Sequence, residues 1–224
     1  MMILHLFSNP GVQGIEYIKN AIIPHFSGVS NPVLAYLPAG NADMYKWLNY
    51  TVQVFQGEAK VDLLDPDNMS PNLFLEILEH SSGLYITGGN VYLLSYRLHR
   101  AKVFNQLRSI IRGGLPVVAF SAGTVLCGVD ISTTLDEDFC EMKDYTGLAL
   151  VPYGLSVHAT ENNIRLLQKK SALIQSPILA IEDNSYLQVT DTAIQVLSGT
   201  CWRISPNSQE AAWHLPLFRA GNKG

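Results

Sequence analysis

The amino-acid sequence predicts an α/β fold: a mainly parallel sheet with helices on both faces and antiparallel strands at one edge. Up to about residue 130, short apolar runs alternate with segments whose apolar residues recur at helical spacing. Glycine or proline residues lie at the ends of most of these segments. The chain has 224 residues, of which 47% are hydrophobic and 15% are charged, so we expect residues 1–224 to form one domain with a full core.

The first part of the chain is expected to build the parallel half of the sheet. The expected strands cover residues 3–7, 33–37, 61–64, 83–87 and 117–120. The expected helices cover residues 15–26, 42–55, 71–79, 91–98, 101–111 and 122–129. This strict alternation is typical of strand–helix–strand units, in which consecutive strands run parallel.

The pattern changes after residue 130. Residues 131–145 are polar and acidic, and short strand-like runs follow at 148–151 and 156–157. A helix is expected at 164–173. Three short strands are then expected at 178–182, 186–189 and 193–197, with turns between them. Turns this short favour antiparallel pairing, so these three strands are expected at one edge of the sheet.

Composition argues against several classes of function. The formal net charge is −4 and Lys and Arg form no long cluster, so neither nucleic acid nor a membrane is an expected partner. Three cysteines at unrelated spacings predict no disulfide framework and no zinc site. No cofactor or metal is expected. The first residues do not resemble a signal peptide, and we expect a cytoplasmic protein.

Ser121 lies between an expected strand and an expected helix, with small residues two positions before it (Ala119) and two after it (Gly123). This arrangement is typical of a nucleophile elbow, a turn so sharp that bulky neighbours would collide. The serine hydroxyl is then exposed beside the free N–H groups at the helix start. The alternative is a serine that only caps a helix.

A second turn, Gly88-Gly89-Asn90, follows the preceding strand. Active sites of parallel sheets lie at the carboxyl ends of the strands, so this turn and Ser121 should meet there. One N–H of the turn, together with that of Ala122, would form an oxyanion hole. An ordinary turn or a phosphate cradle is the alternative.

A serine nucleophile needs a base, and His158 is the best-placed of six histidines because it follows a short strand-like run. The others are expected in the core (His5), at helix ends or on helix faces (His25, His80 and His99) and near the chain end (His214). A carboxylate should orient the imidazole. Asp136 is slightly favoured by the chain order Ser, Asp, His, and Asp183 is the alternative because it follows a strand.

The chain contains several longer sequence segments that indicate one family. They are Leu4-His-Leu-Phe-Ser-Asn9, Ile86-Thr-Gly-Gly-Asn90, Phe120-Ser-Ala-Gly123, Ser132-Thr-Thr-Leu-Asp136, Gly147-Leu-Ala-Leu-Val-Pro-Tyr-Gly-Leu-Ser-Val-His158 and, more loosely, Ile181-Glu-Asp-Asn-Ser-Tyr-Leu-Gln-Val189. Together they resemble the peptidase E family of aspartyl dipeptidases, whose relatives include the cyanophycinases. The resemblance runs nearly from end to end.

The resemblance implies a fold like that of class I glutamine amidotransferases, with a serine in place of their cysteine. It implies Ser121 as nucleophile, His158 as base, and Gly89 and Ala122 as oxyanion donors. For the third group it leaves Asp136 and Asp183 open. Substrates in the family are short peptides with an N-terminal aspartate, but the arginine-rich patch of the aspartyl dipeptidases is reduced here to Arg165.

The leading hypothesis is therefore a serine exopeptidase acting on short peptides, as a monomer or homodimer. Its alternatives are an esterase or amidase with the same elbow, and a catalytically silent module that binds anions. We expect Asn90 to contact the substrate. A carboxylate of residues 136–138, or Glu182, is expected to bind the substrate ammonium, and Arg165 an aspartate side chain.

Overall fold

The computed structural model describes residues 1–11, 14–40, 43–205 and 218–219. The strands are β1 Ile3–Phe7, β2 Val33–Leu37, β3 Lys60–Leu63, β4 Gly83–Ile86, β5 Val117–Phe120, β6 Gly154–Ser156, β7 Ile178–Ile181, β8 Tyr186–Thr190, β9 Ala193–Ser198, β10 Cys201–Ile204 and β11 Phe218–Arg219. The α-helices are α1 Gly14–Ile22, α2 Met44–Val54, α3 Pro71–Glu79, α4 Val91–Arg100, α5 Phe104–Arg112, α6 Ala122–Leu126 and α7 Ile164–Ile174.

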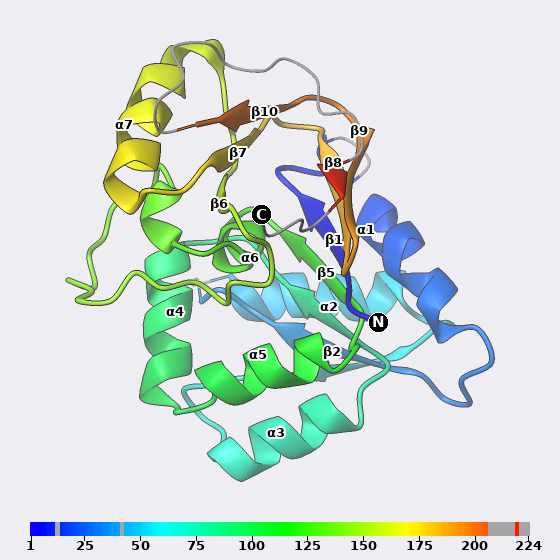
Figure 1. Cartoon of the computed structure of the whole chain (residues 1–224). Coiled ribbons are helices and arrows are strands. Elements are labelled where there is room, and N and C mark those ends of the chain that lie inside the picture. Colours follow the sequence, from blue (N-terminus) through cyan, green and yellow to red (C-terminus); the bar gives the residue numbers. More distant parts are fainter. Residues whose placement is uncertain (12–13, 41–42, 206–217, 220–224) are drawn as a thin grey trace.

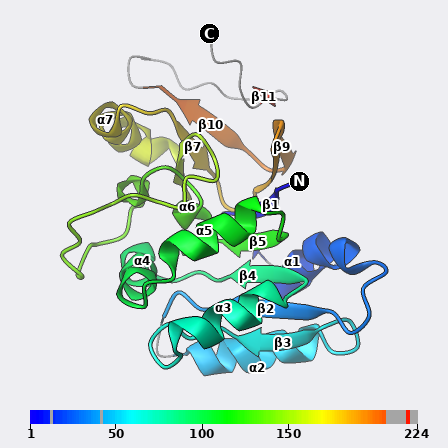
Figure 2. The same ribbon diagram turned by 60° about the horizontal axis from the view of Figure 1, so that its bottom comes forward.

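The strands form two sheets. The larger has eight strands in the order β11-β9-β8-β1-β5-β4-β2-β3, and the smaller has three in the order β10-β7-β6. Figure 2 shows β1, β5, β4, β2 and β3 following one another across the larger sheet. These five strands are parallel, whereas β8, β9 and β11 add antiparallel strands beyond β1. The predicted α/β fold with an antiparallel edge is confirmed.

Successive side chains of the large sheet divide between its two faces, and each face has its own helices. Leu4, Val117 and Ala119 belong to a core shared with α3, α4, α5 and α6. Phe7 and Val118 belong to a second core, with α1 and α2. Strand side chains point alternately to opposite faces, so nearly continuous apolar runs require helices on both.

The expectation for residues 178–182 was wrong in one respect. They were expected at the antiparallel edge, but β7 pairs parallel with β6 and antiparallel with β10 in the separate small sheet. Figure 1 shows α7 beside this sheet, away from α3 and α5. Leu167 of α7 shares a buried cluster with Ile178 and Trp202. The sequence pattern gave a strand here correctly but could not show its partner, because pairing is non-local.

Three other expectations also need correction. Residues 148–151 form no strand, because their N–H groups bond to carbonyls at the end of α6, as from Leu150 to Cys127. The helix expected to reach residue 129 ends at Leu126. The helix expected over 15–26 divides at Pro24 into α1 and a 3-10 helix, η2 (Ile23–Phe26). Ala42, the expected first residue of α2, lies outside the described residues.

No helix in the described part of the chain is both long and apolar enough to cross a bilayer.

Buried His5 and partly buried His25 form a pair between β1 and η2. His5 Nε2 lies 2.8 Å from His25 Nε2, and His5 Nδ1 hydrogen-bonds the hydroxyl of Tyr186. Burial, and then the nearby His25, lower the pKa of His5 from 6.5 to about 4. His5 is therefore neutral in the folded protein at a pH at which the unfolded chain would be protonated.

This difference predicts that the free energy of unfolding decreases as pH falls from 6.5 towards 4, because the unfolded chain then binds a proton that folded His5 does not. The loss should be on the order of 3 kcal/mol. Urea unfolding of wild type and His5→Phe between pH 4.5 and 7 measures it, with His80→Gln as the exposed control. The His5 variant should have the flatter profile; an unchanged slope would contradict the prediction.

Candidate active site

Two serines lie side by side at the carboxyl edge of the large sheet. Strands β1 and β5 are parallel, and Phe7 pairs with Phe120, the last residue of each strand. Ser8 and Ser121 are the next residues, so the register brings them to the same edge. The backbone N–H of Ser121 donates to the carbonyl of Phe7 at 3.0 Å, which continues the pairing into the turn.

Ser121 has the backbone conformation of a strained elbow, with φ 50° and ψ −115°. Non-glycine residues adopt a positive φ at a cost of about 1–3 kcal/mol, and such strain is concentrated at functional sites. The close approach of the neighbouring backbone requires small residues. A Cβ on Gly123 would lie 2.5 Å from the carbonyl oxygen of Ile86, and one on Gly88 would lie 3.1 Å from Cβ of Ser121.

His158 lies within hydrogen-bond distance of this serine. Its Nε2 is 3.0 Å from Oγ of Ser121. His158 follows β6 and also has a positive φ, 54°. Two bonds around it hold this conformation: the N–H of Ala159 donates to Ile181, and the side-chain amide of Asn163 donates to the carbonyl of His158.

Asp183 completes a chain of hydrogen bonds. Its Oδ1 lies 2.6 Å from Nδ1 of His158. The parallel pairing of β6 with β7 explains this contact. Ser156 is in register with Ala180, and the segments that directly follow the two strands contain His158 and Asp183. The two side chains are 45% and 50% exposed, so the group opens to solvent. This is the geometry of an acid–base–nucleophile triad.

The slight preference for Asp136 is not supported by this geometry. Nδ1 of His158 is occupied by Asp183, whereas Asp136 lies at the N-terminus of α4. There its Oδ2 is 3.5 Å from the backbone nitrogen of Val91. A carboxylate is favoured at this place by the positive end of the helix dipole. Chain order, which favoured Asp136, does not determine which carboxylate reaches the imidazole.

Ser8 was not singled out from the sequence as a site residue. It is fully buried, and its hydroxyl donates to Oδ1 of Asp183 at 3.2 Å while accepting from the backbone N–H of His158 at 2.8 Å. One side chain thus contacts both partners of the triad. The available signal was its place directly after the first strand, at the edge where Ser121 was expected.

The backbone N–H groups of Gly89 and Ala122, near Ser121, have no acceptor among the described residues. Both belong to turns that end parallel strands, β4 and β5. Asn90, by contrast, is engaged at both ends of its side chain: Oδ1 accepts from the N–H of Leu93, and Nδ2 donates to the carbonyl of Glu137. It caps α4 and fastens the acidic loop beside the glycine turn.

The remaining candidates differ in their surroundings. The carboxylate of Asp138 accepts from the N–H groups of Cys140 and Met142 and from the hydroxyl of Tyr145. Asp136 and Glu137 are exposed, and Glu182 is partly exposed next to Asp183. Arg165 is exposed on the first turn of α7.

Other nucleophile and metal chemistry finds little support in the part of the chain that is described. Burial raises the pKa of the Cys127 thiol to about 12, so this thiol remains protonated and unreactive. No group of three or more His, Cys, Asp and Glu side chains among the described residues could hold a metal ion. His214 lies outside the described residues.

The chain is similar to known proteins along most of its length. A family model described as Peptidase family S51 matches residues 4–197. The chain is 27% identical over 205 residues to a peptidase E of Shewanella sp. (strain W3-18-1), covering 86% of each chain. It is 25% identical over 212 residues to a peptidase E of Nostoc sp. (strain PCC 7120), covering 87% of this chain and 85% of that one.

The fold is also that of a solved peptidase. A crystal structure of a peptidase from an acI-B1 Actinobacterium matches with a TM-score of 0.71 at 13% identity, covering 98% of this chain and 97% of that chain. The family match includes the elbow at Ser121 and the segment that carries His158 and Asp183. This protein therefore belongs to Peptidase family S51.

Proposed function

We propose that this peptidase is a serine exopeptidase that hydrolyses short peptides, with Ser121 as nucleophile, His158 as general base and Asp183 as the orienting carboxylate. The observation that carries the proposal is the continuous chain of hydrogen bonds from Ser121 through His158 to Asp183. A core histidine or a helix-capping serine would have no reason to form this chain at a strained, half-exposed turn.

The hydrogen bonds assign a role to each nitrogen of the imidazole. Asp183 accepts the proton on Nδ1, which leaves Nε2 as the acceptor for the hydroxyl of Ser121. As Oγ attacks the substrate carbonyl, Nε2 takes its proton and then gives that proton to the leaving amine. Water attacks the resulting acyl-enzyme by the same route, with His158 again as base.

The N–H groups of Gly89 and Ala122 would stabilise the oxyanion that forms during attack. They belong to the turn before α4 and to the first residue of α6, where backbone N–H groups have no partner within a helix. Donors held by the backbone need no reorganisation as charge develops, which makes them effective at lowering the barrier.

The free ammonium of the substrate requires an acceptor, because this group distinguishes an exopeptidase substrate from the interior of a longer chain. Asp136 and Glu137 are the best candidates, since the bond from Asn90 to the carbonyl of Glu137 holds their loop beside the glycine turn. Glu182 is the other candidate, next to Asp183. Asp138 is less suited because three described donors already engage its carboxylate.

The preference for an aspartate side chain is not part of this proposal. Arg165, the cation suggested for that role, lies on α7 and does not line the cavity beside Ser121. A reducing compartment such as the cytoplasm agrees with the three cysteines, which are all free thiols.

The main test is hydrolysis of a panel of dipeptides and of their N-acetylated forms. Wild type should cleave the free dipeptides and leave the acetylated ones intact, because acetylation removes the ammonium. Ser121→Ala should lose roughly four or more orders of magnitude in rate. Ser109→Ala, on the exposed face of α5, is the control. Equal cleavage of acetylated and free peptides, or an active Ser121 variant, would sink the proposal.

The choice of carboxylate gives a second prediction. Asp183→Asn should lower kcat by about three to four orders of magnitude, because it leaves the imidazole in the wrong tautomer. Asp136→Asn should act mainly on KM for free dipeptides and change labelling of Ser121 by a fluorophosphonate less than tenfold. If Asp136→Asn slowed the labelling of Ser121 more than Asp183→Asn did, Asp136 would be the carboxylate of the triad.

Ser8 gives a third prediction, as a positioning residue. Ser8→Ala removes the hydroxyl that contacts both His158 and Asp183, so kcat should fall by roughly 10- to 100-fold while KM changes little. Steady-state kinetics on one dipeptide separates the two constants. A higher KM with unchanged kcat, or no change in either constant, would show that Ser8 has only a structural role.

A further inference from the structure

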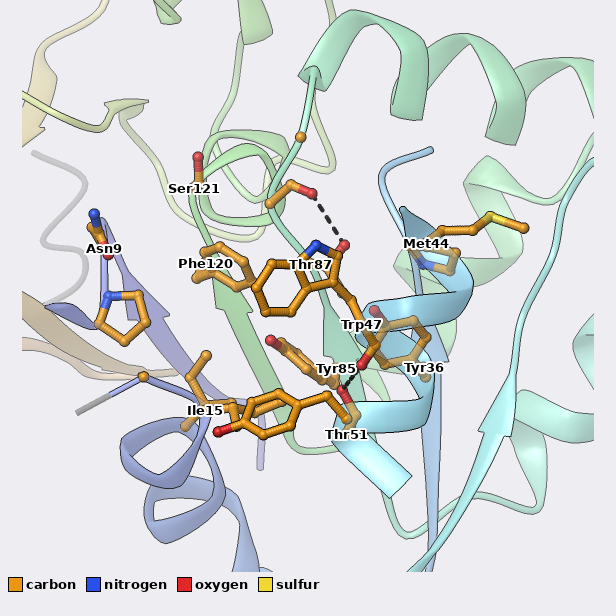
Figure 3. A pocket seen from close by; sticks show the side chains of 17 residues that line it. Asn9, Ile15, Tyr36, Met44, Trp47, Thr51, Tyr85, Thr87, Phe120 and Ser121 are labelled. Carbon is orange, nitrogen blue, oxygen red and sulfur yellow. Dashed lines mark hydrogen bonds between the residues drawn. The ribbon is translucent and has the colours of Figure 1, made fainter. Parts of the chain in front are cut away.

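A cavity of about 610 Å³ opens directly beside Ser121, on the face of the large sheet that α1 and α2 cover. Its walls are mainly aromatic and aliphatic. Figure 3 shows the side chains of Phe120, Tyr85 and Trp47 below Ser121. Ile15 and Tyr36 also line the cavity. Its volume is ample for one large side chain.

The floor of the cavity follows from the pleat of three parallel strands. Tyr36 and Tyr85 are in register on β2 and β4, and their ring centroids lie 5.4 Å apart in an edge contact. Phe120, at the end of β5, lies next to Tyr85. Burial raises the pKa of Tyr36 to about 12 and that of Tyr85 well above its usual value, so both phenols stay neutral.

None of the described residues that line the cavity is charged. Arg97, behind the wall at Pro38, is neutralised by Asp65 and Asp67. Lys46 lies 5.7 Å from the ring of Trp47 but does not line the cavity. A carboxylate placed inside would lose its hydration without gaining a cation.

The rim of the cavity exposes two large aromatic side chains. Trp47 and Tyr50, one turn apart on α2, are 48% and 44% exposed, and their rings pack against each other. Met44, on the same helix, adds a flexible apolar wall. Exposed aromatic side chains at the rim of a cavity beside a candidate nucleophile provide a surface that an apolar ligand would bury.

The position of the histidine indicates which part of the substrate enters. His158 must give its proton to the leaving amine, so the leaving group lies on the side of His158. The cavity contains Ser121 and the Gly88-Gly89 turn, but His158 and Asp183 do not line it. The side chain on the acyl side of the scissile bond therefore faces the cavity. In an exopeptidase of this kind, that is the amino-terminal residue.

We propose that this enzyme prefers dipeptides and short peptides whose amino-terminal residue is aromatic or large and aliphatic, and that Trp47 is a specificity-determining residue for it. This inference rests on the proposed exopeptidase function. It replaces an acidic side chain by an apolar one as the group that the site selects.

The test compares kcat/KM for Phe–Ala, Leu–Ala, Asp–Ala, Ala–Ala and Ala–Phe. Wild type should favour Phe–Ala over both Asp–Ala and Ala–Ala by roughly tenfold or more, the effect of burying one large apolar side chain. Ala–Phe should gain little, because its ring lies on the leaving side.

Variants of α2 connect this preference to the cavity. Trp47→Ala should lower the ratio of Phe–Ala to Ala–Ala by about tenfold. Tyr45→Ala, an exposed aromatic on the same helix that does not line the cavity, should leave the ratio unchanged. Trp47→Arg should raise Asp–Ala relative to Phe–Ala. Turnover of Ala–Ala shows that each variant is folded.

A wild-type preference for Asp–Ala, or a Phe–Ala ratio that is insensitive to Trp47, would overturn the inference and leave the proposed function intact. A loss of Asp–Ala cleavage in Lys46→Met would show that an acidic side chain is read by that cation, and would also overturn it. If wild type cleaves no dipeptide and a fluorophosphonate does not label Ser121, the proposed function fails and the inference fails with it.

Discussion

The hydroxyl of Ser8 joins the two sheets at the point where the side chains of Ser121, His158 and Asp183 meet. Ser8 directly follows β1 of the large sheet, whereas His158 and Asp183 follow β6 and β7 of the small one. By donating to Asp183 and accepting from the N–H of His158, one buried hydroxyl sets the distance between Ser121 and its partners. A second contact, from the N–H of Asn184 to the carbonyl of Asn9, supports the same junction.

The site stores backbone strain on both sides of this junction. Ser121 and His158 both have positive φ, and neither is glycine. Such conformations persist only where the surroundings over-determine them. For Ser121 that support comes from Thr124, whose hydroxyl donates to the carbonyls of Phe7 and Ala119 and so fastens α6 to β1 and β5. The strain keeps the serine hydroxyl out of the sheet and towards the imidazole.

The two faces of the large sheet differ in how completely helices cover them. The face covered by α3, α4 and α5 packs aliphatic side chains into the main core. The other face carries aromatic residues at the carboxyl ends of β2, β4 and β5, and α2 does not close over them completely. The apolar cavity is thus a part of the second core that is left open beside Ser121. The same alternation of side chains that builds the core also builds the proposed binding site.

The sequence by itself determined the parallel half of the sheet, the elbow at Ser121 and the choice of His158 as the candidate base. These features are local: apolar periodicity, small residues around a sharp turn, and a polar residue after a strand. Only the tertiary structure decided that Asp183 and not Asp136 contacts His158, and that Ser8 bridges Asp183 and His158. It also decided that β7 belongs to the small sheet. Ser8 is 150 positions from His158 and 175 from Asp183, and contacts at such separations depend on strand pairing that no local pattern encodes.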